Sequence, residues 1–334
     1  MPYPITVALG VGAIAQQAMT VLYQHRLVST DQLHRLLTPH HTRAEYMRRQ
    51  LHRLRMAGLA DAVGRRAHGQ TSLLWWLTAK GAQAVEAAGL LPSRPYRMSP
   101  EAAAGPLQEH TLATVETGIS FAHWARKLGH DCGPLDWSPE IAHYFREESR
   151  PGEDLSLVPD AVLSYVHTDA RKRTLLTFFV EIDRATMTVA RLAHKLHAYA
   201  CYQKYVPQGG ARTPSTRRRS TNSPSAQAWR SRYPVFPRLL IVFTGAPRPR
   251  LERRIADLRS LAASNPVLLA QPLRAGATTL DQLQRVGPFA PIFTPILGSD
   301  DPTDAWLHHE AIPALPPGER DRDFPTKTAA AKGC

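Results

Sequence analysis

Along the first hundred residues, the spacing of apolar positions changes from that of helices to that of strands and then back. Apolar residues recur at helical spacing in residues 13–25, 32–37, 43–56 and 78–88. Between the last two of these segments, residues 59–63 and 72–77 have the apolar and β-branched or aromatic content of strands. Ser29 and Thr42 precede the second and third helical segments and are suited to cap them. We therefore predict three helices, a two-stranded hairpin and a fourth helix.

The rest of the chain alternates long helical segments with apolar runs. Helical spacing predicts long helices at residues 107–128 and 186–205. Strands are predicted at residues 134–137, 155–166, 174–181 and 239–244. Helices and strands that alternate in this way indicate an α/β (α+β) domain with a mixed sheet.

Breaks in composition predict the domain organisation. At 334 residues the chain is long enough for two domains. Residues 98–106 have the composition of a linker between an N-terminal domain, 1–97, and a second domain, 107–295. Within the second domain, residues 207–238 contain seven Arg and no acid, which predicts a mobile basic loop. Residues 296–334 are predicted to be a disordered tail.

The charge of the chain favours a polyanionic partner. Lys and Arg number 41 against 28 Asp and Glu, which gives a net charge of +13. Residues 1–97 hold 12 of the basic residues and 4 of the acidic ones, a net charge of +8. This excess suits nucleic acid, although solubility alone is an alternative explanation. Neither GxxxxGK(S/T) nor GxGxxG occurs, which disfavours an NTPase or a dinucleotide enzyme.

The cysteines and apolar segments favour a cytoplasmic protein. Cys132, Cys201 and Cys334 are widely spaced, so they suggest neither a disulfide framework nor a zinc knuckle. No segment reaches the roughly 20 apolar residues of a membrane-spanning helix, so no membrane partner is expected. His194 and His197 lack the spacing of a zinc site and are expected to be surface or phosphate-contacting residues.

The third predicted helix is the most basic part of the N-terminal domain. Tyr46, Leu51 and Leu54 are predicted to face inward, which leaves the Arg residues on the outer surface. A basic helix followed by a hairpin resembles winged helix-turn-helix domains, in which that helix enters the major groove and the wing follows the phosphates. A solvated helix face and a protein-binding domain remain alternatives. The residues expected to contact DNA are Arg43, Arg48, Arg49, Arg53, Arg65, Arg66, Arg217, Arg218 and Arg219.

Acidic residues at strand ends predict a phosphodiester site in the second domain. Asp160 follows a proline at the start of one strand, and Glu181 and Asp183 end the next. Lys195 and Tyr199 share one face of the following helix. The order of elements resembles the restriction-endonuclease-like, or PD-(D/E)xK, fold, whose acidic strands hold a metal ion.

The resemblance to that fold implies Mg²⁺ or Mn²⁺ held by Asp160, Glu181 and Asp183. In its motif a Lys lies two positions after the second acid, but here Asp183 takes that position. Lys195 or Arg184 is left to supply the basic group that stabilises developing negative charge. The alternative is that these acids close a turn and form ion pairs without binding a metal.

Three segments together resemble the replication-relaxation family of plasmids and integrative elements. They are PDAV at residues 159–162, FFVEIDRATM at 178–187 and LAHKLHAYACY at 192–202, and they follow the winged-helix pattern. The resemblance implies a role in plasmid replication or DNA relaxation, with double-stranded DNA and a plasmid replication or transfer protein as partners. Two functions follow as expectations. One is a metal-dependent DNA nuclease or nickase, and the other is a non-catalytic replication, transfer or transcription accessory protein with a nuclease-like fold.

Overall fold

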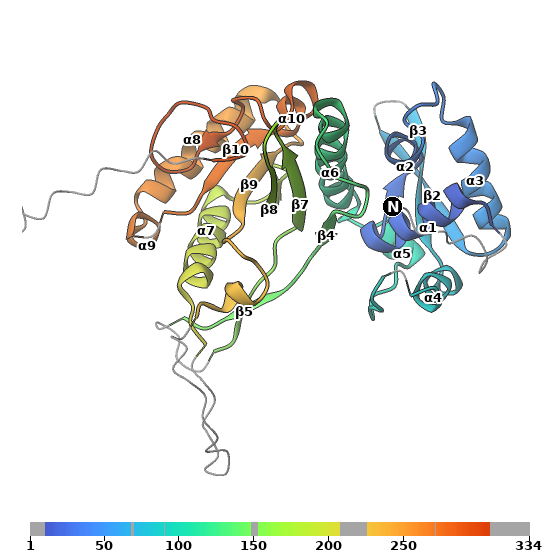
Figure 1. The fold of residues 1–334 in the computed structure, drawn as a ribbon, viewed down its shortest axis with the longest axis horizontal. Coiled ribbons are helices and arrows are strands. Elements are labelled where there is room, and N and C mark those ends of the chain that lie inside the picture. The colour runs from blue at the N-terminus through green and yellow to red at the C-terminus, as the bar shows by residue number, and fades with distance from the viewer. Residues whose placement is uncertain are drawn as a thin grey trace, which may run out of the picture.

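The computed structural model shows a mixed α and β chain with two connected parts, an N-terminal part and a larger part built on a six-stranded sheet (Figure 1). The residues that the structure describes are 11–67, 70–89, 91–147, 153–207, 226–270 and 272–307. No described helix is both long and apolar enough to cross a membrane.

The N-terminal part packs four helices against a three-stranded antiparallel sheet of order β1-β3-β2. Its helices are α1 (Ala13–His25), α2 (Thr30–Leu37), α3 (Glu45–Met56) and α4 (Ala79–Ala87). Its strands are β1 (Val28–Ser29), β2 (Ala60–Ala67) and β3 (Gln70–Leu77). The predicted helices and hairpin are therefore confirmed, while β1 was not predicted.

Side-chain caps mark the starts of two helices in this part, at Ser29 before α2 and at Thr78 before α4. The Ser29 side chain accepts a hydrogen bond from the backbone N–H of Gln32, whose side-chain oxygen accepts one from the N–H of Ser29. Ser29 therefore caps α2 as predicted, although the helix begins two residues earlier than predicted, at Thr30. Helix α3 begins at Glu45 without a side-chain cap, so Thr42 does not have the predicted role.

The larger part contains a mixed sheet of order β11-β10-β9-β8-β7-β4 between two helical layers. Its strands are β4 (Trp137–Pro139), β7 (Ala161–Thr168), β8 (Arg173–Asp183), β9 (Arg238–Phe243), β10 (Ala275–Thr279) and β11 (Thr294–Pro295). Strands β8, β9 and β10 are parallel to one another, and β7 is antiparallel to β8. A separate pair, β5 (His143–Phe145) and β6 (Leu155–Leu157), precedes β7.

Side chains that alternate along β8 face the two helical layers. Phe178 and Ile182 belong to the core with α6 (Gln108–Leu128), whereas Phe179 belongs to the core with α7 (Val189–Lys204). The remaining helices of this part are α8 (Arg248–Ala263), α9 (Pro266–Ala270) and α10 (Leu280–Val286). Helices α7 and α8 lie on one side of the sheet, and α6 lies on the other (Figure 1).

Helix α6 lies between the sheet and the N-terminal part, and so it is buried on several sides (Figure 1). A Cβ atom on Gly118 would lie 2.2 Å from the ring of Trp137, so only glycine lets the helix approach β4 this closely. The Trp137 ring stacks on His25 of α1 at 4.4 Å between centroids. One hydrophobic core therefore continues from the N-terminal part into the sheet.

Two predicted irregular segments contain structure. In the predicted linker, α5 (Pro100–Ala103) buries Ala103 completely. In the predicted basic loop, residues 226–238 include a 3-10 helix, η1 (Ala228–Ser231), with Trp229 buried and its indole N–H donating to the carbonyl of Gln203. The large apolar side chain of Trp229 lets this segment pack on the core, which the high Arg content of the segment did not indicate. Residues 208–225 lie outside the described residues.

The start of the predicted tail also packs on the sheet. Ile296 and Leu307 are buried, and the backbones of Phe293 and Thr303 pair as an isolated bridge. Residues 296–307 therefore differ from the predicted disorder because their apolar side chains complete the core. Residues 308–334 lie outside the described residues.

Candidate functional site

The predicted acids lie at one edge of the sheet. Asp160 immediately precedes β7, and Glu181 and Asp183 are at the carboxyl end of β8. Because the two strands are antiparallel, with Ala161 paired to Val180, the start of β7 lies beside the end of β8. Helix α7 packs on the face of the sheet to which Glu181 belongs (Figure 1).

Lys195 and Tyr199 of α7 both reach Glu181. The Lys195 Nζ atom lies 2.5 Å from Glu181 Oε2 and 3.9 Å from Asp160 Oδ1. The Tyr199 hydroxyl donates to Glu181 Oε1. The structure therefore brings Asp160, Glu181 and Lys195 together, as the sequence predicted. Of the two basic candidates, Lys195 is the one at the acids, since no ion pair of Arg184 with them is found among the described residues.

His110 is a member of the site that the sequence did not indicate. Its Nε2 atom lies 3.2 Å from Asp160 Oδ1, and the backbone N–H of Ile182 donates to Asp160 Oδ2 at 2.7 Å. His110 lies in the first turn of α6, across the sheet from α7. No sequence spacing links residue 110 to residue 160, so only the fold reveals the contact.

Asp183 has a different environment from the other two acids. Arg254 of α8 donates to its Oδ2 atom at 2.6 Å, and the backbone N–H of Ala185 donates to its Oδ1 atom at 2.6 Å. The side chain is 1% exposed. The predicted convergence of three carboxylates is thus replaced by a pair, Asp160 with Glu181, because Arg254 binds Asp183 separately.

Burial and charge shift the pKa values of the site in different directions. Burial and the nearby charge of Asp160 raise the pKa of Glu181 to about 8, despite the hydrogen bonds from Lys195 and Tyr199. Burial opposes ionisation of Asp160, but the hydrogen bond from His110 and the charge of Lys195 outweigh it and lower its pKa. Burial also opposes the charge of Lys195, yet the attraction of Glu181 and Asp160 raises its pKa.

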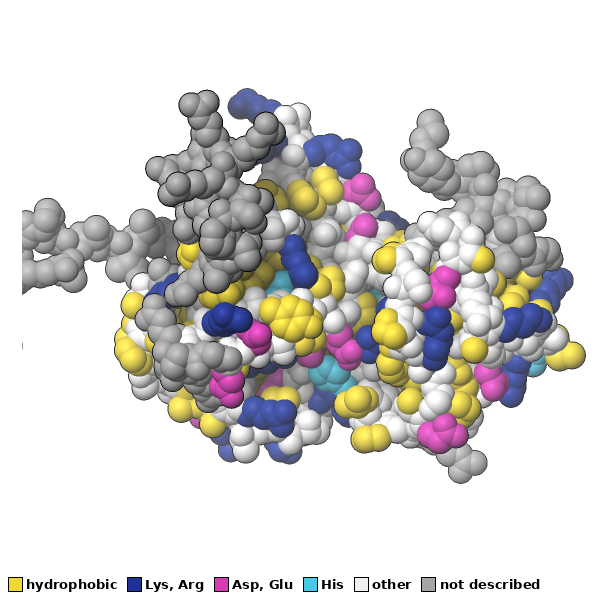
Figure 2. Space-filling model, turned by 90° about the horizontal axis from the view of Figure 1, so that it is seen from below, with side chains coloured by type: hydrophobic (Ala, Val, Ile, Leu, Met, Phe, Trp, Pro, Cys, Tyr) yellow, Lys and Arg dark blue, Asp and Glu magenta, His cyan; other side chains and the backbone are white. Residues whose placement is uncertain are grey.

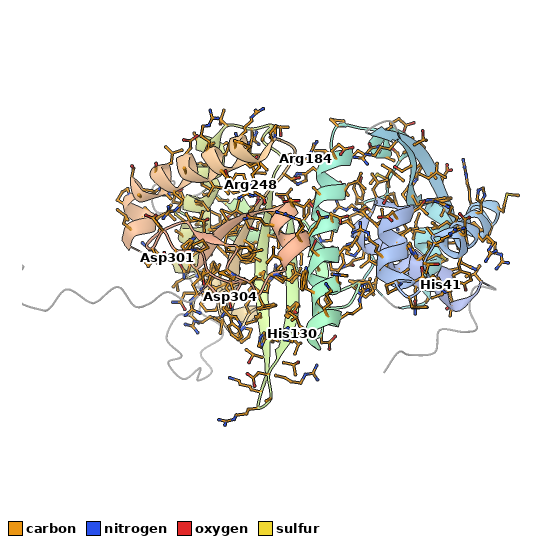
Figure 3. All side chains as sticks on the ribbon, turned by 90° about the horizontal axis from the view of Figure 1, so that it is seen from above. His41, His130, Arg184, Arg248, Asp301 and Asp304 are labelled. Carbon is orange, nitrogen blue, oxygen red and sulfur yellow. The ribbon has the colours of Figure 1, made fainter. Side chains whose placement is uncertain are left out.

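The site is open to solvent on the side of Asp160, His110 and Lys195. The Glu181 side chain is 4% exposed, whereas those of Asp160 and Lys195 are 19% and 32% exposed. A cavity of about 30 Å³ lies beside Asp160, between α6 and the end of α1. Figure 3 places Arg184, in the turn that follows β8, and His130 toward opposite ends of α6.

The charges of the site suit a divalent cation held by two carboxylates. Lys195 Nζ lies close to both Glu181 and Asp160, so the two carboxyl groups together favour a positive charge at this position. Carboxylate oxygens are the ligands that Mg²⁺ and Mn²⁺ prefer. Among the described residues, Asp160 and Glu181, without Asp183, are therefore the pair that could hold such an ion once Lys195 and Tyr199 share Glu181 with it.

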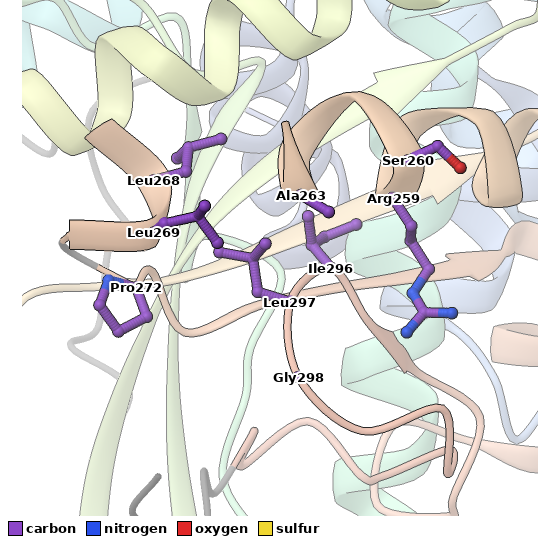
Figure 4. A pocket seen from close by; sticks show the side chains of 9 residues that line it. All are labelled: Arg259, Ser260, Ala263, Leu268, Leu269, Pro272, Ile296, Leu297 and Gly298. Carbon is purple, nitrogen blue, oxygen red and sulfur yellow. The ribbon is translucent and has the colours of Figure 1, made fainter. Parts of the chain in front are cut away.

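A larger hollow elsewhere in the structure lacks this chemistry. It has a volume of about 330 Å³ and is lined by apolar side chains of α8, α9 and the segment after β11, with Arg259 at one side (Figure 4). Arg259 pairs with Asp300 at 2.6 Å and donates to the carbonyl of Pro295 at 2.8 Å, so its charge is used within the fold.

Helix α3 and the residues just before it expose four of the nine Arg residues predicted to contact DNA. Arg43, Arg48, Arg49 and Arg53 are exposed, and Arg48 pairs with Glu45. The inward face of the helix contains Met47 and Gln50 in addition to the predicted Leu51 and Leu54, while Tyr46 is only partly buried. Met47 therefore takes the inward position predicted for Tyr46, whose ring stacks instead on that of His41, with 5.3 Å between the centroids.

Arg65, in contrast, forms an ion pair inside the molecule. Its guanidinium binds both carboxylate oxygens of Glu109 on α6, at 2.5 and 2.7 Å, so it joins β2 to the larger part. The side chains of Arg66, Arg217, Arg218 and Arg219 lie outside the described residues. On the face seen in Figure 2, basic side chains are spread among acidic and hydrophobic ones and do not form one patch.

The fold and this site define a mixed α and β protein with a basic N-terminal helix and a paired-carboxylate centre at a sheet edge. The model of the replication-relaxation family matches residues 19–214, which include both the N-terminal part and the segment from Asp160 to Lys195. The chain belongs to the replication-relaxation family. No curated protein and no solved structure matches the chain.

Proposed function

We propose that this protein binds double-stranded DNA of a plasmid or mobile element and cleaves one strand at a metal-dependent centre during replication or relaxation. The observation that carries the proposal is the meeting of Asp160, Glu181 and Lys195 from β7, β8 and α7 at one sheet edge. Two carboxylates can hold a metal ion that activates water and neutralises the phosphate, and a lysine can stabilise the negative charge that develops. A plasmid replication or transfer protein in the cytoplasm is the proposed partner.

The N-terminal part is proposed to be a winged helix-turn-helix domain that holds the duplex. Its order of elements, with α3 before the β2–β3 hairpin, resembles that of such domains. Arg49 and Arg53 support this role because they are exposed and form no ion pair among the described residues. Charged groups without internal partners are those best able to neutralise phosphates.

The larger part is proposed to be a nuclease-like domain in which each side chain has a distinct role. Asp160 and Glu181 would hold Mg²⁺ or Mn²⁺, which supplies charge neutralisation and a more acidic bound water. Lys195 lies within reach of both acids and stabilises negative charge that develops on the phosphate. His110 orients Asp160, and Tyr199 orients Glu181.

The second candidate function is a DNA clamp without catalysis. Two observations favour it: Arg254 neutralises Asp183, and Lys195 with Tyr199 already satisfies both oxygens of Glu181. In this case the acids and Lys195 stabilise the fold, and only the N-terminal part engages DNA.

Conversion of supercoiled plasmid to open circles in the presence of Mg²⁺ or Mn²⁺ separates the two functions. We expect the native chain to form open circles and Asp160→Asn and Lys195→Ala to lose this activity almost completely, because each removes one charge of the centre. Asp281→Asn is the matched control, since Asp281 is an exposed acid on α10 that pairs with Arg285. Binding of plasmid by the native chain without cleavage would support the clamp. Equal cleavage by Asp160→Asn would exclude the proposed centre.

A further inference from the structure

Helix α7 carries a second set of polar side chains on a different side from Lys195 and Tyr199. His197 and Cys201 follow these two residues by two positions, which places them about 200° further around the helix. They are four residues apart from one another, so their side chains lie one above the other. Both contact Glu147, which belongs to the connection between β5 and β6.

Three different ligand types meet at this point. His197 Nε2 lies 2.9 Å from Glu147 Oε1, and Cys201 Sγ lies 3.4 Å from His197 Nε2 and 3.7 Å from Glu147 Oε1. Within the part of the chain that the structure describes, this is the one group of three or more His, Cys, Asp or Glu residues whose ligand atoms all lie within 4.8 Å. All three residues are partly buried, so they are both held in place and reachable by an ion.

We propose that Glu147, His197 and Cys201 form a zinc-binding site that is separate from the paired-carboxylate centre. Imidazole, thiolate and carboxylate are all ligands of Zn²⁺, whereas Mg²⁺ takes oxygen ligands almost alone. The ligand atoms are close enough to share one ion after small side-chain rotations. Three protein ligands leave a fourth position for water or another group. The sequence did not indicate this site because Glu147 lies 50 residues before His197.

Zinc at this position would have to displace one proton. Burial and the charge of Glu147 raise the pKa of the Cys201 thiol to about 11, so the thiol is protonated without a metal. Zinc binds the thiolate, so its binding releases that proton. Nε2 coordination also places the ring proton of His197 on Nδ1. The contact between Nδ1 and Asn265 Nδ2 would then be lost, but at 3.4 Å it is longer than a normal hydrogen bond.

The position of the site indicates what a bound ion would do. Glu147 follows β5, and α7 carries Lys195 at the paired carboxylates. An ion shared by Glu147, His197 and Cys201 would attach the β5–β6 connection to the helix that supplies Lys195. Zinc would therefore stabilise the fold and hold α7 against the sheet, whether or not the carboxylate centre cleaves DNA.

Titration of the metal-free full chain with Co²⁺ tests the proposal, because a cobalt–thiolate bond gives a charge-transfer absorption band. We expect the band to saturate at one equivalent and to disappear when Zn²⁺ displaces Co²⁺. Cys201→Ser should lose the band, and Glu147→Gln and His197→Gln should weaken binding at least about tenfold. His194→Gln is the control, because His194 is an exposed histidine on the same helix. Glu181→Gln should keep the band even if the carboxylate centre proves inactive.

A second readout guards against variants that fold poorly. Zn²⁺ should protect Cys201 of the native chain from a thiol-alkylating reagent, with Cys334→Ser used to remove one competing thiol. Absence of the cobalt band in the native chain, its survival in Cys201→Ser, or unchanged alkylation of Cys201 with Zn²⁺ would each overturn the proposal.

Discussion

The ionisation of the buried Glu181 side chain affects both the stability of the fold and the chemistry of the site. One ammonium group, that of Lys195, faces two carboxyl groups, and the more exposed of them, Asp160, has a lowered pKa. Lys195 therefore stays charged, whereas burial and the charge of Asp160 hold the pKa of Glu181 well above its usual range, at about 8. A divalent cation supplies a further positive charge, which favours release of the Glu181 proton.

The raised pKa of Glu181 predicts a pH dependence of folding stability. Because its pKa is raised from 4.5 to about 8, its contribution to stability is complete below about pH 4.5 and is lost as the pH rises through about 8. The amide of Glu181→Gln does not titrate, so this variant should lose less stability over that range. We expect a difference on the order of 4 kcal/mol in urea unfolding between about pH 5 and about pH 8.5. Glu252→Gln, an exposed site on α8, is the control. Parallel pH profiles for Glu181→Gln and the native chain would contradict the assigned shift.

Among the elements, α7 is the one whose contacts in the site the sequence predicted best. The spacing of Lys195 and Tyr199 predicted a shared face, and the structure directs both to Glu181. The same spacing gave no information about His197 and Cys201, because their partner comes from a distant connection. His110 and Arg254 were missed for the same reason, since contacts between elements depend on how helices pack on the sheet.

The exposed Arg residues of α3 are predicted to contribute to the affinity for DNA. Arg49→Ala with Arg53→Ala should weaken binding to double-stranded DNA and reduce the slope of log affinity against log salt by about 2, or about 1 for each lost phosphate contact. Fluorescence anisotropy over a range of salt concentrations measures both quantities. Arg248→Ala is the control, because Arg248 is exposed on α8 and pairs with Glu252, across the sheet from α3 (Figures 1 and 3). An unchanged salt slope in the double variant would remove α3 from the DNA interface.

At the scale of the molecule, composition separated two parts that the structure joins through one core. The pattern of apolar positions predicted the long helices and strands up to residue 244, because those elements have local signals. It missed the short elements β1, α5, β5 and η1, and the strand predicted at residues 155–166 is divided into β6 and β7. It did not show that α6 is covered on both sides, since burial by the N-terminal part depends on long-range contacts such as Arg35 with Glu116, at 2.6 Å. The division of the chain into independent domains stays a prediction. The elements after residue 244 were not predicted; they are helices α8, α9 and α10 and strands β10 and β11.

Ion pairs join the N-terminal part to α6 of the larger part. Arg65 and Arg35 of the N-terminal part pair with Glu109 and Glu116 of α6, and α6 also carries His110 at the carboxylate centre. A duplex bound by α3 would therefore have a fixed direction relative to that centre. This geometry accords with a protein that holds DNA with one part and acts on it with the other.

Thermal unfolding with Mn²⁺ is the most direct measurement of the central claim, that Asp160 and Glu181 form a metal-binding centre with Lys195. We predict that Mn²⁺ stabilises the native chain, by about 2.7 kcal/mol at a concentration 100 times the dissociation constant. Glu181→Gln should lose this stabilisation, and Cys201→Ser should keep it, because Cys201 belongs to the separate zinc site. An equal Mn²⁺-induced shift in the native chain and Glu181→Gln, or no shift in the native chain at millimolar Mn²⁺, would contradict the account.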